Sequence, residues 1–146
     1  MRRISILAGG LVAVVAAAGC GGGSSKPTIK ITSPSNNATA AGGTVTATVS
    51  PKNFKLNGAD VGKKPIKGEG HLHFSMDDGK YDFPKYSGAN GQLAVKLGVQ
   101  GKYSPSVTSS ITYTGLPAGK HTLEVYLANN DHSNVGPSAD VSITVK

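Results

Sequence analysis

The sequence predicts an all-β domain, an immunoglobulin-like or fibronectin-like antiparallel β-sandwich of about seven strands. Short runs rich in β-branched residues recur along the chain, and Gly, Pro, Asn and Asp punctuate almost every gap between them. No window of about eleven residues carries a convincing helical apolar period. The expected strands are residues 28–32, 43–50, 71–76, 92–97, 110–115, 121–128 and 139–145.

Residues 1–19 are typical of a lipoprotein signal peptide and do not belong to the predicted fold. Arg2 and Arg3 precede an apolar run that is short for a membrane span and ends in Ala-Ala-Gly-Cys. Cys20 is the only cysteine of the chain, and this ending resembles the bacterial lipobox, in which the cysteine is acylated. The alternative is a plain secretory signal with an incidental cysteine.

The expected mature protein is therefore a bacterial cell-envelope lipoprotein, held outside the cytoplasm by a lipid on Cys20. Residues 20–26, rich in glycine and serine, form a flexible tether, and residues 27–146 form one domain. Because the lone thiol would carry lipid, the domain cannot contain a disulfide and must depend on a hydrophobic core.

The positive charge of the chain does not favour nucleic-acid binding. The formal net charge is +7, but Arg2 and Arg3 are the only arginines, so every cation of the expected domain is a lysine. Nucleic-acid readers rely on arginine for bidentate contacts, and we expect no such partner. Five lysines fall within residues 52–67, which suits either a solvated loop or attraction to anionic lipid or cell-wall polymer.

The alternation of side chains along the expected strand 71–76 separates its histidines from its core residues. Leu72, Phe74 and Met76 share one face, while His71 and His73 share the other. The apolar set must face the core, so both imidazoles are expected to point outward. This also makes Met76 a core residue rather than a metal ligand.

His132 is expected to lie beside these two histidines. In an immunoglobulin-like sandwich, strand 71–76 runs antiparallel to strand 121–128, so the loop that follows the latter lies near His71 and His73. Two histidines on one strand face and a third on a loop form a three-nitrogen site suited to Zn²⁺ or Cu²⁺. The alternative is that all three are exposed polar residues of a two-sided sheet. Three further residues are expected to complete the site or hydrogen-bond to its rings: Asp131, Glu124 and Tyr126.

His121 has a different expected role. It shares the parity of Leu123 and Val125, and it stands where many sandwiches place a corner residue that hydrogen-bonds to the preceding turn. We expect a structural histidine, with metal ligation as the alternative.

No pattern in the chain is typical of an enzyme, and we expect a binding protein. No Gly-x-Ser-x-Gly elbow is present, and Asp77-Asp78-Gly79 indicates a turn rather than a catalytic or calcium-binding pair. The aromatic residues of segment 80–88 are expected to pack a long connection onto the sandwich or to form a platform for glycan or protein: Tyr81, Phe83 and Tyr86.

Three motifs in order carry a family resemblance. Gly-x-Gly-His-x-His (68–73), Leu-Pro-Ala-Gly-Lys-His-Thr-Leu (116–123) and Asn-Asp-His with a following Gly-Pro (130–137) resemble secreted bacterial immunoglobulin-like domains of unknown function. The resemblance covers most of the domain from Gly68 onward. It implies the fold and the importance of the histidines, His121 included, but no activity.

A looser similarity is to the periplasmic copper-resistance protein C family. Residues 123–145 share the outline of its last two strands, and His132 matches the histidine of the intervening loop. That family also uses a histidine at a free mature N-terminus for Cu²⁺, which an acylated Cys20 would not provide.

Two functions follow as expectations. The first is a lipid-anchored module that binds copper or zinc through His71, His73 and His132, with His121 as a lesser candidate. The second is a structural or adhesive surface lipoprotein without metal, which binds protein, glycan or cell-wall polymer through residues 52–67 or 81–86. Because imidazole coordinates only when neutral, metal affinity is expected to collapse below about pH 6.

Overall fold

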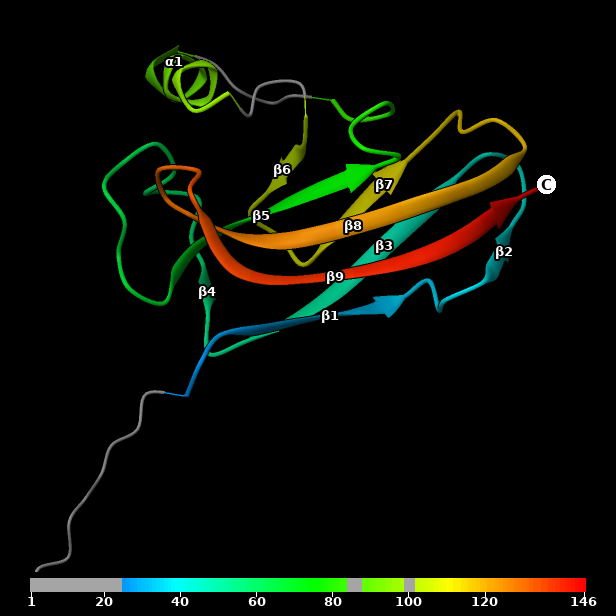
Figure 1. Cartoon of the computed structure of the whole chain (residues 1–146), viewed down its shortest axis with the longest axis horizontal. Helices are drawn as coiled ribbons and strands as arrows, with labels where there is room; N and C mark the ends of the chain where they lie inside the picture. The colour runs from blue at the N-terminus through cyan, green and yellow to red at the C-terminus, as the bar shows by residue number, and fades with distance from the viewer. Residues whose placement is uncertain (1–24, 84–87, 99–101) are drawn as a thin grey trace, which may run out of the picture.

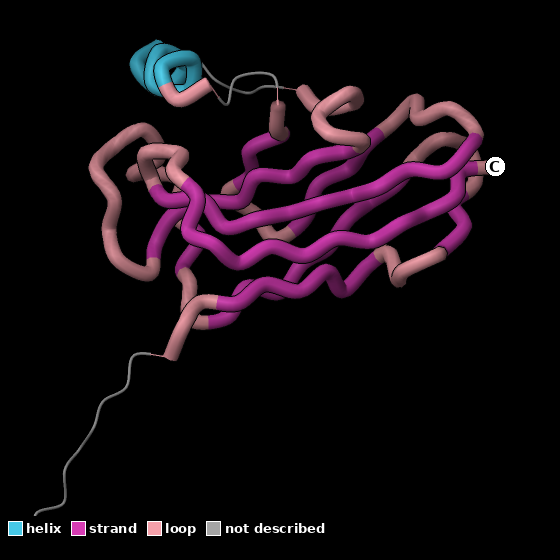
Figure 2. Tube along the Cα trace, in the orientation of Figure 1, coloured by secondary structure: helices cyan, strands magenta, loops and turns pink. Residues whose placement is uncertain are grey.

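The computed structural model describes residues 25–83, 88–98 and 102–146, and these form a sandwich of two β-sheets (Figure 1). One sheet contains β1 (Thr28–Ser33), β3 (Val45–Lys52) and β7 (Ser110–Tyr113). The other runs in the order β2 (Ala38–Ala40), β9 (Asn134–Val145), β8 (Gly119–Asn129), β5 (Glu69–Met76) and β4 (Lys55–Leu56). A further strand, β6 (Ser104–Ser106), also pairs with β5. Figure 2 shows that strands are the main regular secondary structure of the described chain.

The pairing confirms the predicted immunoglobulin-like sandwich. β3 lies between β1 and β7 and is antiparallel to both, while β8 lies between β5 and β9 and is antiparallel to both. The short β2 runs parallel to the end of β9. Among the described residues, six of the seven expected strands are present, and β2, β4 and β6 are short additions.

The strand expected at residues 92–97 is wrong, because residues 88–96 form helix α1 (Gly88–Lys96). Its Gln, Leu, Ala and Lys residues are good helix formers. Figure 1 draws α1 apart from both sheets, on the side of the sandwich where β6 lies. Val95 and Leu97 are 56% and 43% exposed, so the apolar alternation that suggested a strand does not correspond to burial.

The core between the sheets is built from the faces that the alternation predicts. Leu72, Phe74 and Met76 of β5 are fully buried in it, which confirms Met76 as a core residue. β8 contributes Leu123, Val125 and Leu127, and the three-stranded sheet supplies the opposing side with Val45, Ala47, Val49, Ile111 and Tyr113.

Asp82 fixes the connection that leaves β5. Its Oδ2 accepts a hydrogen bond from the Met76 amide (2.8 Å), and its Oδ1 accepts from Ser104 Oγ (2.5 Å) and from the Tyr113 hydroxyl (2.6 Å). The carboxylate thus joins β5, β6 and β7.

Two of the three aromatic residues in this connection pack onto the sandwich. Tyr81 lies edge-on to His121 and Phe83 edge-on to Tyr113, and both pack against the core. Tyr86 lies outside the described residues, as do the expected signal peptide and Cys20. In the described part of the chain, no helix has the length and apolarity needed to cross a membrane.

Gly70 sets the position of the first histidine. A Cβ at this residue would collide with the backbone oxygen of Ala128, so only glycine allows β5 and β8 to approach as they do. The register that results pairs Gly70 with Asn129 and His71 with Ala128. His71 is thereby placed next to the turn between β8 and β9.

Candidate metal centre

His71 and His73 lie on the face of β5 that is turned away from the core, as their parity predicts. Both are nevertheless 0% exposed, so the expectation that they are surface histidines is wrong, although their direction away from the core is as predicted. The reason is that other parts of the chain cover this face. The ring of Tyr103 stacks on His73 at 5.2 Å between centroids, and the ring of His132 lies 4.7 Å from that of His71 and 5.3 Å from that of His73.

The turn between β8 and β9 presents His132 to this face. His132 has a left-handed backbone conformation (φ 68°), and its amide donates a hydrogen bond to the Asn129 carbonyl at 2.9 Å. Asp131 Oδ1 accepts hydrogen bonds from the amide and the hydroxyl of Ser133, at 3.1 and 2.6 Å. Asp131, expected near the metal, therefore shapes the turn that carries His132.

The three histidines meet through one ring nitrogen each, and we call them the histidine trio. His71 Nε2 lies 2.8 Å from His73 Nε2 and 2.9 Å from His132 Nδ1, and the latter two atoms are 3.1 Å apart. Two nitrogens that bind one ion at about 2.0–2.1 Å can be no more than about 4 Å apart. All three pairs satisfy this limit, so the trio could hold one metal ion.

Hydrogen bonding alone cannot satisfy the trio. A neutral imidazole nitrogen carries either one N–H or one lone pair. Among three atoms in mutual contact, at most two of the three contacts can join a donor to an acceptor, and the third joins two donors or two acceptors. Three lone pairs around one cation would remove this conflict.

The remaining nitrogens of two rings have partners suited to a metal site. Asn90 Oδ1 accepts a hydrogen bond from His132 Nε2, which leaves the lone pair of His132 on Nδ1, toward the other two rings. His73 Nδ1 lies 3.0 Å from the Tyr126 hydroxyl, which can accept its N–H. Metal-binding histidines commonly donate their second N–H in this way, which fixes the ring and its tautomer.

His71 differs from the other two rings. Its Nδ1 is buried and has no hydrogen-bond partner among the described residues. The side-chain amide of Asn130, in the turn before His132, is likewise buried, and neither its Nδ2 nor its Oδ1 has a hydrogen-bond partner in the described chain. Unsatisfied buried polar atoms are costly, and such atoms are often explained by a water or ligand.

The trio is held in the neutral state that coordination requires. Burial, with a smaller contribution from the charge of His132, lowers the pKa of His71 to about 3. Burial, with the charges of His71 and His132, lowers the pKa of His73 to about 2. Burial also lowers the pKa of His132, against the opposing effect of Asp131. The pH dependence of metal binding therefore depends on these lowered pKa values rather than on the ordinary pKa of histidine.

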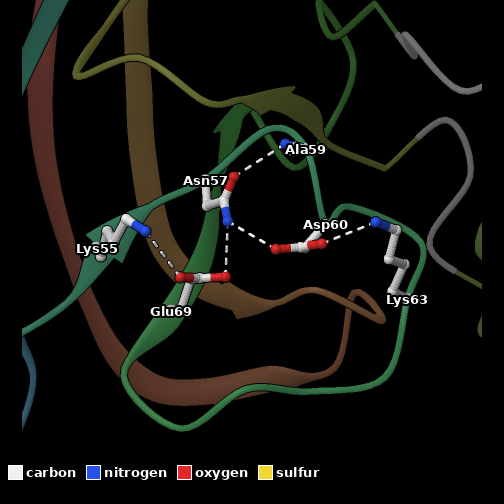
Figure 3. Close-up of polar contacts among 6 residues, drawn as sticks. All are labelled: Lys55, Asn57, Ala59, Asp60, Lys63 and Glu69. Carbon is white, nitrogen blue, oxygen red and sulfur yellow. Dashed lines mark hydrogen bonds and ion pairs between the residues drawn. The ribbon is translucent and has the colours of Figure 1, made fainter.

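A polar network joins the loop between β4 and β5 (residues 57–68) to the starts of both strands (Figure 3). Asn57 Nδ2 donates to Asp60 Oδ2 at 2.8 Å and to Glu69 Oε1 at 2.7 Å. Lys55 and Lys63 extend this network through ion pairs with Glu69 and Asp60, at 3.2 and 2.8 Å. Two of the five lysines in segment 52–67 are thus paired with carboxylates of their own loop and its neighbouring strand.

The same loop touches the residues around His132. The amide of Gly62 donates to the Asn130 carbonyl at 2.6 Å. Gly62 has a positive φ of 87°, and a Cβ there would lie 3.2 Å from Asn90 Oδ1, the atom that accepts from His132. A side chain at this position would therefore press on the Asn90–His132 contact.

His121 lies away from the trio and has the contacts of a corner residue. Its Nδ1 lies 2.7 Å from Asp77 Oδ2, and its Nε2 lies 2.9 Å from the carbonyl oxygen of Pro117, four residues earlier, so the ring donates to both only when it is protonated. Burial lowers the pKa of His121, but the hydrogen bonds to Pro117 and Asp77 outweigh it, and the net shift is upward. Asp77 and Asp78 form the turn after β5, as expected.

Of the other residues predicted for the site, one contacts the trio and one does not. Tyr126 contacts the trio, whereas Glu124 lies opposite Ser75, two residues further along the strands than the His73–Tyr126 pair. Asn90 and Tyr103 were not predicted from the sequence. No motif marks either residue, because their positions depend on how the described residues 88–98 and 102–109 lie relative to β5.

Comparisons with known proteins assign no family to the chain. No protein-family model and no curated protein matches it. Among solved structures, an engineered protein is similar with a TM-score of 0.42 and 11% identity, over 84% of this chain and 21% of that one. A type I cohesin–dockerin complex from Clostridium thermocellum is similar with a TM-score of 0.34 and 15% identity, over 84% of this chain and 100% of that one. The present chain thus spans about a fifth of the engineered protein.

Replacing Asn90 with alanine is expected to weaken binding of Zn²⁺ or Cu²⁺ by about 10- to 100-fold, the usual effect of losing such a partner. The substitution removes the acceptor that fixes the tautomer of His132. Gln92→Ala is the matched control, because Gln92 is an exposed amide on the same helix. Titration calorimetry of both variants measures the effect, and equal affinities would show that Asn90 does not orient a ligand.

Proposed function

We propose that this protein binds one copper or zinc ion through His71, His73 and His132, and that it holds or hands over this ion outside the cytoplasmic membrane, where Cys20 anchors it. The observation that carries the proposal is the convergence of three imidazole nitrogens within 2.8–3.1 Å of one another in a fully buried position. We infer a binding role rather than a catalytic one.

The donor set supports copper or zinc in particular. Imidazole nitrogen suits Zn²⁺, Cu²⁺ and some other transition metals, whereas Ca²⁺ and Mg²⁺ prefer oxygen ligands. The trio offers nitrogen only, and the nearby carboxylate oxygen of Asp131 is engaged by Ser133.

The beginning of the described chain supports the anchored arrangement. Lys26 lies just before β1, at the end of the sandwich that carries the trio. Its carbonyl accepts a hydrogen bond from Asn53 Nδ2 at 3.1 Å. Residues 25–27 share a cavity there with Asn129, which pairs with Gly70 next to His71. Five residues lie between Cys20 and Lys26, and the six extended steps from one to the other span at most about 20 Å. A lipid on Cys20 would therefore keep the trio close to the membrane surface.

Titration calorimetry with Zn²⁺ and Cu²⁺ tests the proposal directly. We expect one ion per chain with a dissociation constant below about 10 μM, since the ligands are already in place and little ordering is needed. Failure of both ions to bind at this level would reject the metal-binding function. Ca²⁺ serves as the control ion and is expected not to bind at this site.

A further inference from the structure

A cavity of about 420 Å³ adjoins the trio at His71. Its walls come from Gly58 and Val61 of the loop before β5, from Asn90 of α1, and from residues 105–108. Apart from neutral His71, no residue of this lining has an ionisable side chain. The cavity therefore borders His71 itself and Asn90, which accepts the hydrogen bond from His132. Its volume lies within the range of small-molecule sites.

The geometry of the trio leaves one side of a bound ion open. An ion about 2.0–2.1 Å from three nitrogens that are only 2.8–3.1 Å apart must lie outside their plane, with about 90° between its bonds. Three ligands then occupy one side of the ion. The opposite side is available to a further ligand.

The trio also leaves the charge of a divalent ion unbalanced. Neutral imidazoles contribute no negative charge. Among the described residues, the carboxylate whose charge acts on the pKa values of His71 and His132 is that of Asp131. A divalent ion and this one carboxylate leave one positive charge in buried surroundings, which is energetically costly. One monovalent anion would balance it.

We propose that, with a divalent ion on the trio, the cavity beside His71 admits a small monovalent anion, either a carboxylate or an inorganic anion, which binds the ion as its next ligand. This inference rests on the proposed function, because it requires the ion. It adds that the protein carries the metal together with an anion. A monovalent ion such as Cu⁺ would be balanced by Asp131 alone and would need no added anion.

Azide titration of the full-length chain loaded with one equivalent of Cu²⁺ tests this proposal. We expect a saturable azide-to-copper charge-transfer absorption, and we expect acetate to suppress it by competition. The chain loaded with Cu⁺ provides the comparison for charge, and its azide affinity, followed by calorimetry, is expected to be at least about tenfold weaker.

Val107→Trp tests whether the anion reaches the ion through the cavity. Val107 lines the cavity and is 46% exposed, so a larger side chain fills that space without displacing core residues. We expect about tenfold or greater weakening of azide and acetate binding, with little change in Cu²⁺ affinity. Val95→Trp is the matched control, because Val95 is similarly exposed but does not line the cavity.

The possible outcomes distinguish a failure of anion binding from a failure of metal binding. If Cu²⁺ binds at one ion per chain and no azide band appears up to about 100 mM, the inference is overturned and the proposed function stands. If azide binds equally well to the Val107→Trp and Val95→Trp variants, the cavity is not its route, and the inference is again overturned. If Cu²⁺ itself does not bind, both fail.

Discussion

Replacing any one histidine of the trio with alanine is expected to lower the affinity for Zn²⁺ or Cu²⁺ by more than about 100-fold. A structural zinc site is worth about 10 kcal/mol or more, and one of three protein ligands accounts for roughly a third of that, about 3 kcal/mol. The loss should be similar at His71, His73 and His132, because their nitrogens are mutual neighbours at 2.8–3.1 Å. Titration calorimetry at pH 7.5 measures it.

His121→Ala is the control for this series. His121 is also a buried histidine, but its two nitrogens contact Asp77 and Pro117 rather than facing the trio. We expect its metal affinity to stay within about threefold of the parent protein, although its thermal stability should fall because two hydrogen bonds are lost. If His121→Ala weakens metal binding as strongly as His73→Ala, or if the trio variants bind normally, the site is elsewhere.

The position of the trio was largely predictable from the sequence. The alternation in β5 separates His71 and His73 from Leu72 and Phe74 with no other information, because a strand has a period of two. The neighbouring arrangement of β5 and β8 follows from the immunoglobulin-like topology. Together they predict that a histidine in the turn after β8 meets the pair on β5, which is what the structure shows for His132.

The burial of the trio was not predictable, for a physical reason. A strand pattern reports which residues share a face, but not whether another segment covers that face. Here Tyr103 stacks on His73 and Asn90 binds His132, and both residues belong to a stretch whose helix was mistaken for a strand. The consequences of burial, neutral rings and restricted access to the site, therefore emerge only from the folded arrangement.

Acid is expected to destabilise the metal-free protein long before it protonates the folded trio. His71 and His73 have folded-state pKa values of about 3 and about 2, lowered mainly by burial, whereas an unfolded histidine has its ordinary pKa of 6.5. Below pH 6.5 the unfolded state therefore binds more protons, and the free energy of unfolding falls by about 1.4 kcal/mol per pH unit for each histidine. Two histidines lose roughly 5 kcal/mol by pH 4.5, which is comparable to the whole stability of many domains.

The raised pKa of His121 does not offset this loss. A raised pKa contributes stability that is complete below the unfolded pKa and is lost only as pH rises through the folded pKa. Its contribution is therefore constant over the acidic range. The slope of the free energy of unfolding against pH comes from the neutral buried rings of His71 and His73. Urea unfolding of the metal-free protein between pH 6 and 4.5 measures that slope.

The double variant His71→Phe, His73→Phe isolates the contribution of these two rings. Phenylalanine fills similar space but does not titrate, so the slope of unfolding free energy against pH should become flatter by roughly 2.7 kcal/mol per pH unit. Equal slopes in the two proteins would contradict the burial of neutral histidines. A bound ion holds the rings deprotonated and stabilises only the folded state, so the loaded protein should retain its ion well below pH 6. Release at lower pH should then coincide with unfolding of the domain, because the folded site gives up its ligands to protons only at much lower pH.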